Sequence, residues 1–402
     1  MKKLYLIVLC VFMMQALKTN AQCPAGRYLT EIFPNVIEDS VTYSVPYGQM
    51  MNIFQPVGDT LSARPVIILG HGGSFITNNG NRYDDPTIDS LCIRFAKRGY
   101  ITVSIDYRTA YGPNMFDSVL AIDEVAKAMS DGKAAIRFFV KDRATGTNTY
   151  KVDTNNIFIG GNSAGAVLYM HVGYIDSLGE CPPNIVSAVN ANGGFEGNSG
   201  NAGYTTKSKA IINLAGGLNE VSFVGPGDKP SVNAQGTTDN VVPYNCGHPL
   251  GGAIPVNLCG LGQLEGAYNA NGIYHMSHLF PGDGHVPWST DLAKLYTVDS
   301  MVTIFLYNLV CTGIASVNNV NINAEVSLFP NPANEAVHVR SSQAVSDIVM
   351  YDQTGRMVFQ ASGINRENYE INTSRLSKGL YFIRMRFVDA NYVPIVRRVV
   401  VE

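Results

Sequence analysis

Residues 156–174, NIFIGGNSAGAVLYMHVGY, decide the fold of this chain. The apolar start predicts a buried strand over 156–161, and the apolar run from Ala164 onward predicts a helix. Between them, Gly161-Asn162-Ser163-Ala164-Gly165 fits the pattern G-x-S-x-G. A sharp strand-to-helix turn of this kind pushes a serine hydroxyl out of the backbone, and the helix N-terminus behind it favours developing negative charge. Ser163 is therefore the candidate nucleophile.

Strands and helices alternate on both sides of this turn. Apolar runs at 66–70 (VIILG) and 101–106 (ITVSID) predict strands, and 89–99 between them is helix-like. Apolar residues spaced by three and four predict a long helix over 118–142. Further apolar runs with Gly or Asn ends lie at 185–194, 210–217 and 231–236. The alternation predicts an α/β region with a mostly parallel sheet and helices on both faces.

A glycine-rich loop, Gly70-His71-Gly72-Gly73-Ser74-Phe75, ends the earlier strand. The glycine-rich backbone of this loop can point N–H groups at an oxyanion, together with the N–H of Ala164 just after the nucleophile. We expect His71 to orient this loop rather than to act as a base, because it precedes the nucleophile strand.

A serine hydroxyl needs a base to take its proton and an acid to orient that base. In folds built around a G-x-S-x-G turn the chain order is Ser, acid, His. Asp239, in GTTDNVVPY, lies just beyond a strand end and is the candidate acid, with Asp228 as its rival. His285, in PGDGHVPW, lies in a Gly-containing loop after the next strand and is the candidate base. Asp283 of that loop is expected to cap it.

Other residues near these loops have plainer explanations. His275 and His278 fall inside the strand before the loop, and His171 and His248 have no strand-end context, so none of the four is preferred as the base. Trp288 follows the histidine loop and either lines an acyl pocket or packs beneath the loop.

The amino-acid composition of the chain changes after residue 315. Residues 316–323 are polar and rich in Asn and predict a linker. Residues 324–402 then form short β-branched and aromatic runs separated by turn residues, which predicts a small all-β sandwich. The predicted organisation is a leader at 1–21, an α/β domain at 22–315, the linker, and this β domain.

The N-terminal residues predict a secretory signal peptide, since two lysines precede a short apolar run and small residues near Ala21. No other stretch is apolar enough to predict a membrane anchor.

Six cysteines lie beyond the leader, and disulfides survive in an exported chain. Fifteen pairings are open to them, with Cys246 and Cys259 the most local candidates. The net charge of −3 provides no basic surface for nucleic acid.

The region 60–290 resembles the α/β-hydrolases of the carboxylesterase and lipase type. The resemblance rests on HGGSF, SIDYR, the approach YKVDTNNIFIGGNSAGA, GTTDNVVPY and GDGHVPW. It implies Ser163 as nucleophile, Asp239 as acid and His285 as base, with oxyanion donors from Gly72, Gly73 and Ala164. One departure is that Ser74 replaces the third glycine of the family's loop.

The C-terminal segment resembles the type A sorting domain of the bacterial type IX secretion system. The blocks SLFPNPANEAVHV, IVMYDQTGRMV, INTSRLSKGLYFIRM and IVRRVVVE carry this resemblance. It implies export by Sec and then across the outer membrane, so the secretion machinery is an expected partner and the protein is expected outside the cell or on its surface.

Together these features predict a secreted serine hydrolase that cleaves carboxylic esters through an acyl-enzyme and needs no metal or cofactor. No long amphipathic lid is evident in 192–235, which favours short-acyl or aryl esters, either soluble or carried on a polysaccharide or polyester. Two alternatives remain open, a secreted serine peptidase and an inactive hydrolase fold that serves in binding or adhesion.

Overall fold

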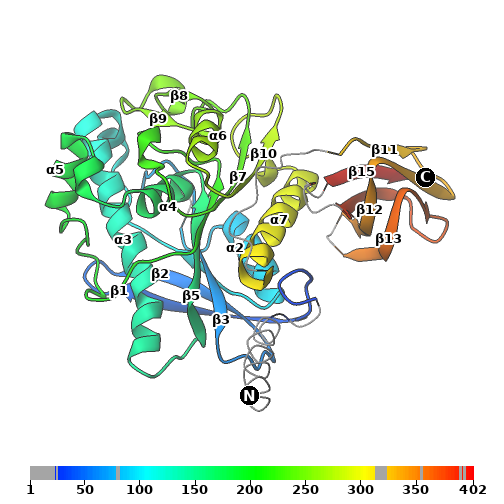
Figure 1. The fold of residues 1–402 in the computed structure, drawn as a ribbon, viewed down its shortest axis with the longest axis horizontal. Coiled ribbons are helices and arrows are strands. Elements are labelled where there is room, and N and C mark those ends of the chain that lie inside the picture. The colour runs from blue at the N-terminus through cyan, green and yellow to red at the C-terminus, as the bar shows by residue number, and fades with distance from the viewer. Residues whose placement is uncertain are drawn as a thin grey trace, which may run out of the picture.

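The computed structural model describes Cys23, Tyr392 and residues 26–77, 82–312, 324–353, 356–388 and 395–402. The predicted signal peptide and the predicted linker at 316–323 lie outside the described residues. Two β-sheets dominate the described parts, a large one flanked by helices and a C-terminal one without helices (Figure 1).

The large sheet has eight strands in the order β1-β2-β4-β3-β5-β6-β7-β10. The two outer pairings, β1 with β2 and β2 with β4, are antiparallel, and all the others are parallel. The predicted mostly parallel sheet is therefore confirmed. The strands are β1 (Val36–Ser44), β2 (Gln49–Pro56), β3 (Arg64–Gly70), β4 (Ile101–Ile105), β5 (Val152–Asn162), β6 (Ala210–Leu214), β7 (Ser231–Gly236) and β10 (His275–Phe280).

Helices cover both faces of this sheet because its central strands are apolar on both sides. In β3, Val66 and Ile68 join one core with α3 and α4, whereas Ile67 and Leu69 join a second core with α2 and α7. The α-helices are α2 (Pro86–Lys97), α3 (Ser118–Ala144), α4 (Ala164–Tyr174), α5 (Pro183–Ala191), α6 (Leu261–Ala270) and α7 (Leu292–Tyr307). Shorter elements are η1 (Gly112–Phe116), η2 (Leu178–Glu180), η3 (Val221–Phe223), β8 (Cys246–Gly247), η4 (Leu250–Gly252), β9 (Leu258–Cys259), η5 (Pro287–Ser289) and η6 (Asn308–Thr312).

Helix α7 begins at a clear cap and lies in the core. The Asp291 carboxylate accepts hydrogen bonds from the N–H groups of Ala293 and Lys294, which have no partner within the helix. By length and composition the stretch Leu292–Thr312 could cross a membrane, but 67% of its most apolar window is buried inside the protein. We therefore read it as the core helix of a folded domain.

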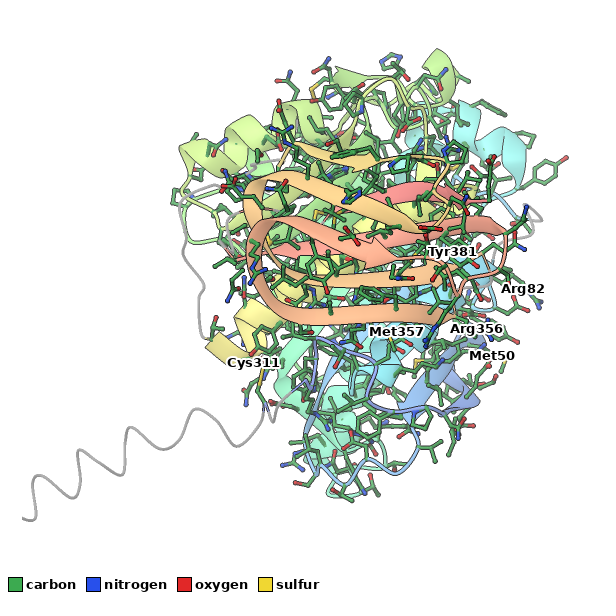
Figure 2. All side chains as sticks on the ribbon, turned by 90° about the vertical axis from the view of Figure 1, so that its right-hand side faces the viewer. Met50, Arg82, Cys311, Arg356, Met357 and Tyr381 are labelled. Atoms are coloured by element: carbon green, nitrogen blue, oxygen red, sulfur yellow. A yellow bond between two sulfur atoms is a disulfide. The ribbon has the colours of Figure 1, made fainter. Side chains whose placement is uncertain are left out.

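The C-terminal strands form an all-antiparallel sheet around a core of their own. Figure 2 shows this sheet face-on, with Met357 and Tyr381 labelled on it. The sequence predicts short runs here, but the structure joins residues 336–352 in one long strand that shifts register after Arg340. The strands are β11 (Val326–Phe329), β12 (Ala336–Asp352), β13 (Met357–Asn372), β14 (Gly379–Phe387) and β15 (Ile395–Val401).

An aromatic contact joins this sheet to the α/β region. Tyr296 of α7 stacks on Tyr351 of β12, with ring centroids 4.9 Å apart, and packs against Phe382 and Val396. The Arg94 guanidinium lies 4.8 Å from the centre of the same Tyr296 ring. The C-terminal sheet thus packs directly against the helix that follows the His285 loop.

Two disulfides form among the six cysteines beyond the leader. Cys23 pairs with Cys311 across 288 residues, and Cys246 pairs with Cys259 across 13. The local pair expected from the sequence is confirmed. Cys92 and Cys181 are free thiols, so four of the six cysteines form disulfides.

His278 of β10 makes folding stability depend on pH. Burial, with a further effect of Arg397 on β15, lowers its pKa to about 4. In the unfolded chain this imidazole binds a proton below about pH 6.5, whereas in the folded protein it does so only near pH 4. The free energy of unfolding is therefore highest above about pH 6.5 and falls as the pH drops from 6.5 to 4. The His278→Phe variant lacks this imidazole. We expect its free energy of unfolding, measured in urea, to fall by about 2 kcal/mol less than that of the wild type between pH 7 and pH 4.5. Parallel losses in the two proteins would contradict this expectation.

Candidate active site

Ser163 occupies the turn between β5 and α4. Its backbone lies at φ 56° and ψ −117°, a region that residues with a side chain rarely adopt. The Ser163 N–H donates to the Leu214 carbonyl at 2.8 Å, which ties the turn to the end of β6. The strained backbone points the hydroxyl away from the sheet, as expected for a nucleophile turn.

The glycines of the motif allow three backbone segments to meet. A Cβ on Gly161 would lie 2.3 Å from the Gly70 carbonyl oxygen, and one on Gly165 would lie 2.1 Å from it. The Gly165 N–H donates to the His71 carbonyl at 2.8 Å. Any larger residue at either position would push the end of β3 away from the start of α4.

Three side chains from separate loops form one hydrogen-bonded chain. Ser163 Oγ lies 2.8 Å from His285 Nε2, and His285 Nδ1 lies 2.7 Å from Asp239 Oδ2. Asp239 follows β7 and His285 follows β10, and these neighbouring parallel strands end at the same edge of the sheet. The structure therefore brings together all three residues that the sequence singled out.

Asp239 is a buried, fully hydrogen-bonded carboxylate. Its Oδ1 accepts from the N–H groups of Val241 and Val242, and its Oδ2 accepts from His285 and from Gln235 Nε2 at 3.2 Å. Every one of these partners donates, so both carboxylate oxygens of Asp239 are used as acceptors. The sequence reasoning missed Gln235; its only signal was a polar residue near the end of an apolar strand.

The glycine-rich loop lies against the nucleophile turn. Gly73, Ser74 and Phe75 all have positive φ, so the chain curls back on itself there. His71 is buried and stacks on Tyr107, and its Nδ1 lies 2.6 Å from the Gly72 carbonyl. This position suits the loop-orienting role expected of His71.

The other carboxylates and the histidine considered from the sequence lie outside the hydrogen-bonded chain at Ser163. Asp228 caps its own loop by accepting from the Gly225 N–H at 2.7 Å, and Asp283 pairs with Lys294 at 2.6 Å. His275 Nδ1 contacts the carbonyl of Ile273, two residues before β10 begins. Trp288 is buried against Phe280 in the core with α7, so it packs beneath the histidine loop.

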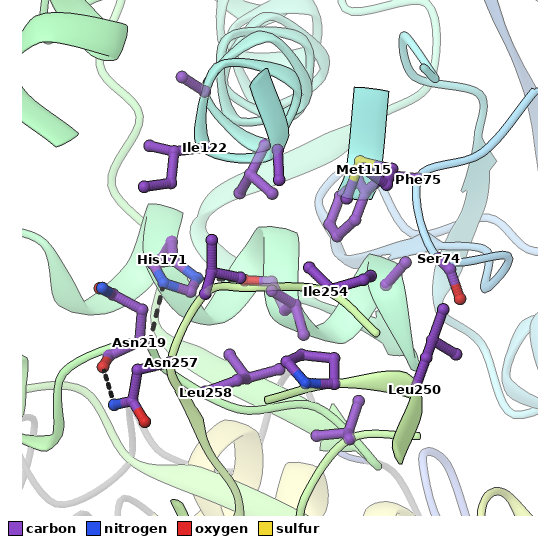
Figure 3. Close-up of a pocket in the computed structure, with 18 of the residues that line it drawn as sticks. Ser74, Phe75, Met115, Ile122, His171, Asn219, Leu250, Ile254, Asn257 and Leu258 are labelled. Carbon is purple, nitrogen blue, oxygen red and sulfur yellow. Dashed lines mark hydrogen bonds between the residues drawn. The ribbon is translucent and has the colours of Figure 1, made fainter. Parts of the chain in front are cut away.

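An apolar pocket of about 100 Å³ opens beside Ser163 (Figure 3). Phe75, Met115 and Ile122 line one side, and residues of the segment 246–259 line the opposite side. A site of this kind holds an apolar group next to the serine hydroxyl.

The far end of the pocket is polar. His171 Nδ1 contacts the Val167 carbonyl and its Nε2 accepts from the Asn219 N–H, and burial lowers the pKa of this imidazole. The Asn219 Oδ1 atom is buried and has no hydrogen-bond partner in the described part of the chain. Neither residue carried a signal in the sequence, because α4 and the loop after β6 meet only in the fold.

The mostly parallel sheet with helices on both faces and the strand-to-helix turn at Ser163 give the chain the α/β-hydrolase fold. Residues 51–219 match the family model described as BD-FAE, whose members are esterase-like α/β-hydrolases, and residues 327–402 match the secretion system C-terminal sorting domain. The chain is thus similar to esterase-like α/β-hydrolases over residues 51–219, and its C-terminal sorting domain indicates export through the type IX secretion system to the cell surface or the medium.

Solved structures share the fold. A truncated carbohydrate esterase from gut microbiota is 19% identical with a TM-score of 0.50, over 69% of this chain and 97% of that one. A thermophilic esterase of Thermogutta terrifontis, Est2, is 18% identical with a TM-score of 0.48, over 68% of this chain and 92% of that one. No curated protein sequence matches the chain significantly.

Proposed function

We propose that the protein is a secreted serine esterase that works through Ser163, His285 and Asp239. The observation that carries the proposal is the unbroken chain from Ser163 Oγ through the His285 imidazole to Asp239 Oδ2. Each distance is that of a good hydrogen bond.

In the proposed reaction, Ser163 Oγ attacks the ester carbonyl while His285 Nε2 takes the hydroxyl proton. Asp239 stabilises the imidazolium that forms and holds the tautomer in which Nε2 can act as a base. The imidazolium then gives its proton to the departing alcohol. Water, activated by the same imidazole, releases the acid from the acyl-enzyme.

The oxyanion of the tetrahedral intermediate would be held by backbone N–H groups. Ala164 is the first residue of α4, where N–H groups lack helical partners. Gly72 and Gly73 supply the opposing donors from the curled loop, with Ser74 at the position next to them. These donors are fixed before the reaction, which is what makes such a site effective.

The pocket supports esters of short or aryl acids. Its volume of about 100 Å³ and apolar lining suit a small acyl group or a single ring. The unpartnered Asn219 Oδ1 at its far end favours an aryl acid that carries a hydroxyl, because a buried acceptor gains from a donor. Export leaves a polysaccharide or polyester as a plausible carrier of the acyl group.

The test is hydrolysis by the purified hydrolase with its tail attached. We expect release of p-nitrophenol from acetate and butyrate esters in preference to palmitate, and faster cleavage of methyl 4-hydroxycinnamate than of methyl cinnamate. Peptide 4-nitroanilides serve as the comparison. Their cleavage in preference to esters would favour the peptidase alternative, and a folded protein without any hydrolysis would favour the binding alternative.

Gln235 is expected to position Asp239. Its Nε2 donates to Asp239 Oδ2 and to the Val242 carbonyl, and its Oε1 accepts from the Leu261 N–H at 2.8 Å. Gln235→Met removes a hydrogen bond to a charged group, so we expect kcat to fall by about 10-fold or more with little change in KM. Gln263→Met is the matched control, because the Gln263 side chain donates to Asn245 Oδ1 at the surface. Wild-type kcat in Gln235→Met would show that the amide is dispensable.

A further inference from the structure

The segment 246–259, here called the disulfide loop, forms one wall of the pocket beside Ser163. Its ends are the two cysteines of a disulfide, which also face each other in the two-residue pairing of β8 with β9. The pocket residues that belong to it are Pro249, Leu250, Ile254, Val256, Asn257 and Leu258. In Figure 3, Leu250, Ile254 and Leu258 lie across the pocket from Phe75 and Ile122.

Little regular structure holds this wall in place. Between its short terminal strands the loop has a single turn of 3₁₀ helix, at Leu250–Gly252. Gly251 and Gly252 have positive φ, and a Cβ on either would have no neighbour within 4 Å. These two glycines therefore face open space within the described part of the chain.

The loop is anchored at both ends and near its turn. Cys259 exchanges backbone hydrogen bonds with Leu218, at 2.7 and 3.0 Å. The Leu250 and Gly251 N–H groups donate to the carbonyls of Val241 and Asn240, directly after Asp239. The covalent bond between Cys246 and Cys259 thus closes a loop whose apolar side chains line the pocket beside Ser163.

We propose that the disulfide loop sets the acyl specificity of the enzyme and that the Cys246–Cys259 bond holds its wall in place for acyl groups longer than acetyl. The proposal rests on the proposed function. An acetyl group offers one methyl to the pocket, whereas a butyryl group adds two methylenes. Each buried methylene contributes a factor of about four in kcat/KM, but only while the wall that covers it stays in contact.

The experiment compares kcat/KM for p-nitrophenyl butyrate and acetate in full-length proteins produced under oxidising conditions. The test variants are Cys246→Ser/Cys259→Ser and Ile254→Ala. Thiol titration shows which disulfides have formed in each protein, and thermal unfolding shows that each protein is folded. The matched control is Cys23→Ser/Cys311→Ser, which removes the disulfide that contributes no residue to the pocket.

We expect the butyrate-to-acetate ratio of kcat/KM to fall at least about threefold in both test variants, whatever change in acetate hydrolysis accompanies it. The control should keep the wild-type ratio. Unchanged ratios in both test variants would overturn the proposal, as would an equal fall in the control. If the double variant does not fold, the butyrate-to-acetate ratio of Ile254→Ala, in which the disulfide is intact, tests the proposal. Absence of ester hydrolysis in the wild type would instead refute the proposed function.

Discussion

Replacement of Ser163 by alanine is expected to lower kcat/KM for p-nitrophenyl butyrate by about 10⁴-fold or more. The His285 imidazole would keep its place beside Asp239 but would have no hydroxyl to deprotonate at 2.8 Å. The oxyanion donors would remain, which is why a small residual rate over water is expected. Steady-state hydrolysis of the purified protein measures the loss.

A matched serine separates loss of the nucleophile from loss of a buried hydroxyl. Ser277 of β10 is buried and its Oγ has no partner within the described residues. Ser277→Ala should keep activity within about twofold, because no hydrogen bond is lost. If Ser163→Ala retained wild-type activity, another nucleophile would have to be sought.

The backbone at Ser163 adds a second readout. At φ 56° and ψ −117° a side chain is strained and glycine is not. Ser163→Gly should therefore be as inactive as Ser163→Ala but more stable than it, by about 1 kcal/mol in urea unfolding. A less stable glycine variant would argue that the turn is not strained.

The sequence predicted the centre of the hydrolase well for a physical reason. A buried parallel strand, a glycine-flanked serine and an apolar helix are consecutive in the chain, so their geometry is local. Asp239 and His285 could be chosen because each follows a strand, and parallel strands present their carboxyl ends at one edge. The distances between them came only with the structure.

Features that depend on distant contacts were predicted less well. The six cysteines allowed fifteen pairings, and only the pair with a short separation could be favoured. Cys92 is buried on α2 and Cys181 follows η2, where neither meets another cysteine. Similarly, the bulges that keep β12 continuous depend on its pairing with β13, and the local sequence suggested two strands.

The pocket was the least predictable part of the site. Its walls come from the η1–α3 segment, from α4 and α5, and from the disulfide loop, so no periodicity in the sequence marks them. Asn219 illustrates the difficulty. Its side chain matters for binding only because the pocket ends beside it. A single asparagine in a loop does not indicate that a pocket lies there.

Replacement of Asp239 by asparagine is expected to lower kcat by about 10³- to 10⁴-fold with the fold retained. The amide has one acceptor oxygen, whereas the carboxylate accepts from Val241, Val242, His285 and Gln235. If the oxygen stays on the Val241 and Val242 N–H groups, the amide NH₂ faces His285 Nδ1. The imidazole must then carry its proton on Nε2, where it can no longer accept the proton of Ser163.

Asp283→Asn is the matched control, since Asp283 lies two residues before His285 in the same loop. It pairs with Lys294 at 2.6 Å and is partly exposed, so loss of its charge removes a surface ion pair worth less than about 1 kcal/mol. We expect activity within about twofold of wild type. Equal losses in Asp239→Asn and Asp283→Asn would mean that the loop as a whole, and not the tautomer of His285, limits the rate. A large loss in Asp239→Asn alone, with KM nearly unchanged, assigns the acid to Asp239 by the geometry that His285 requires.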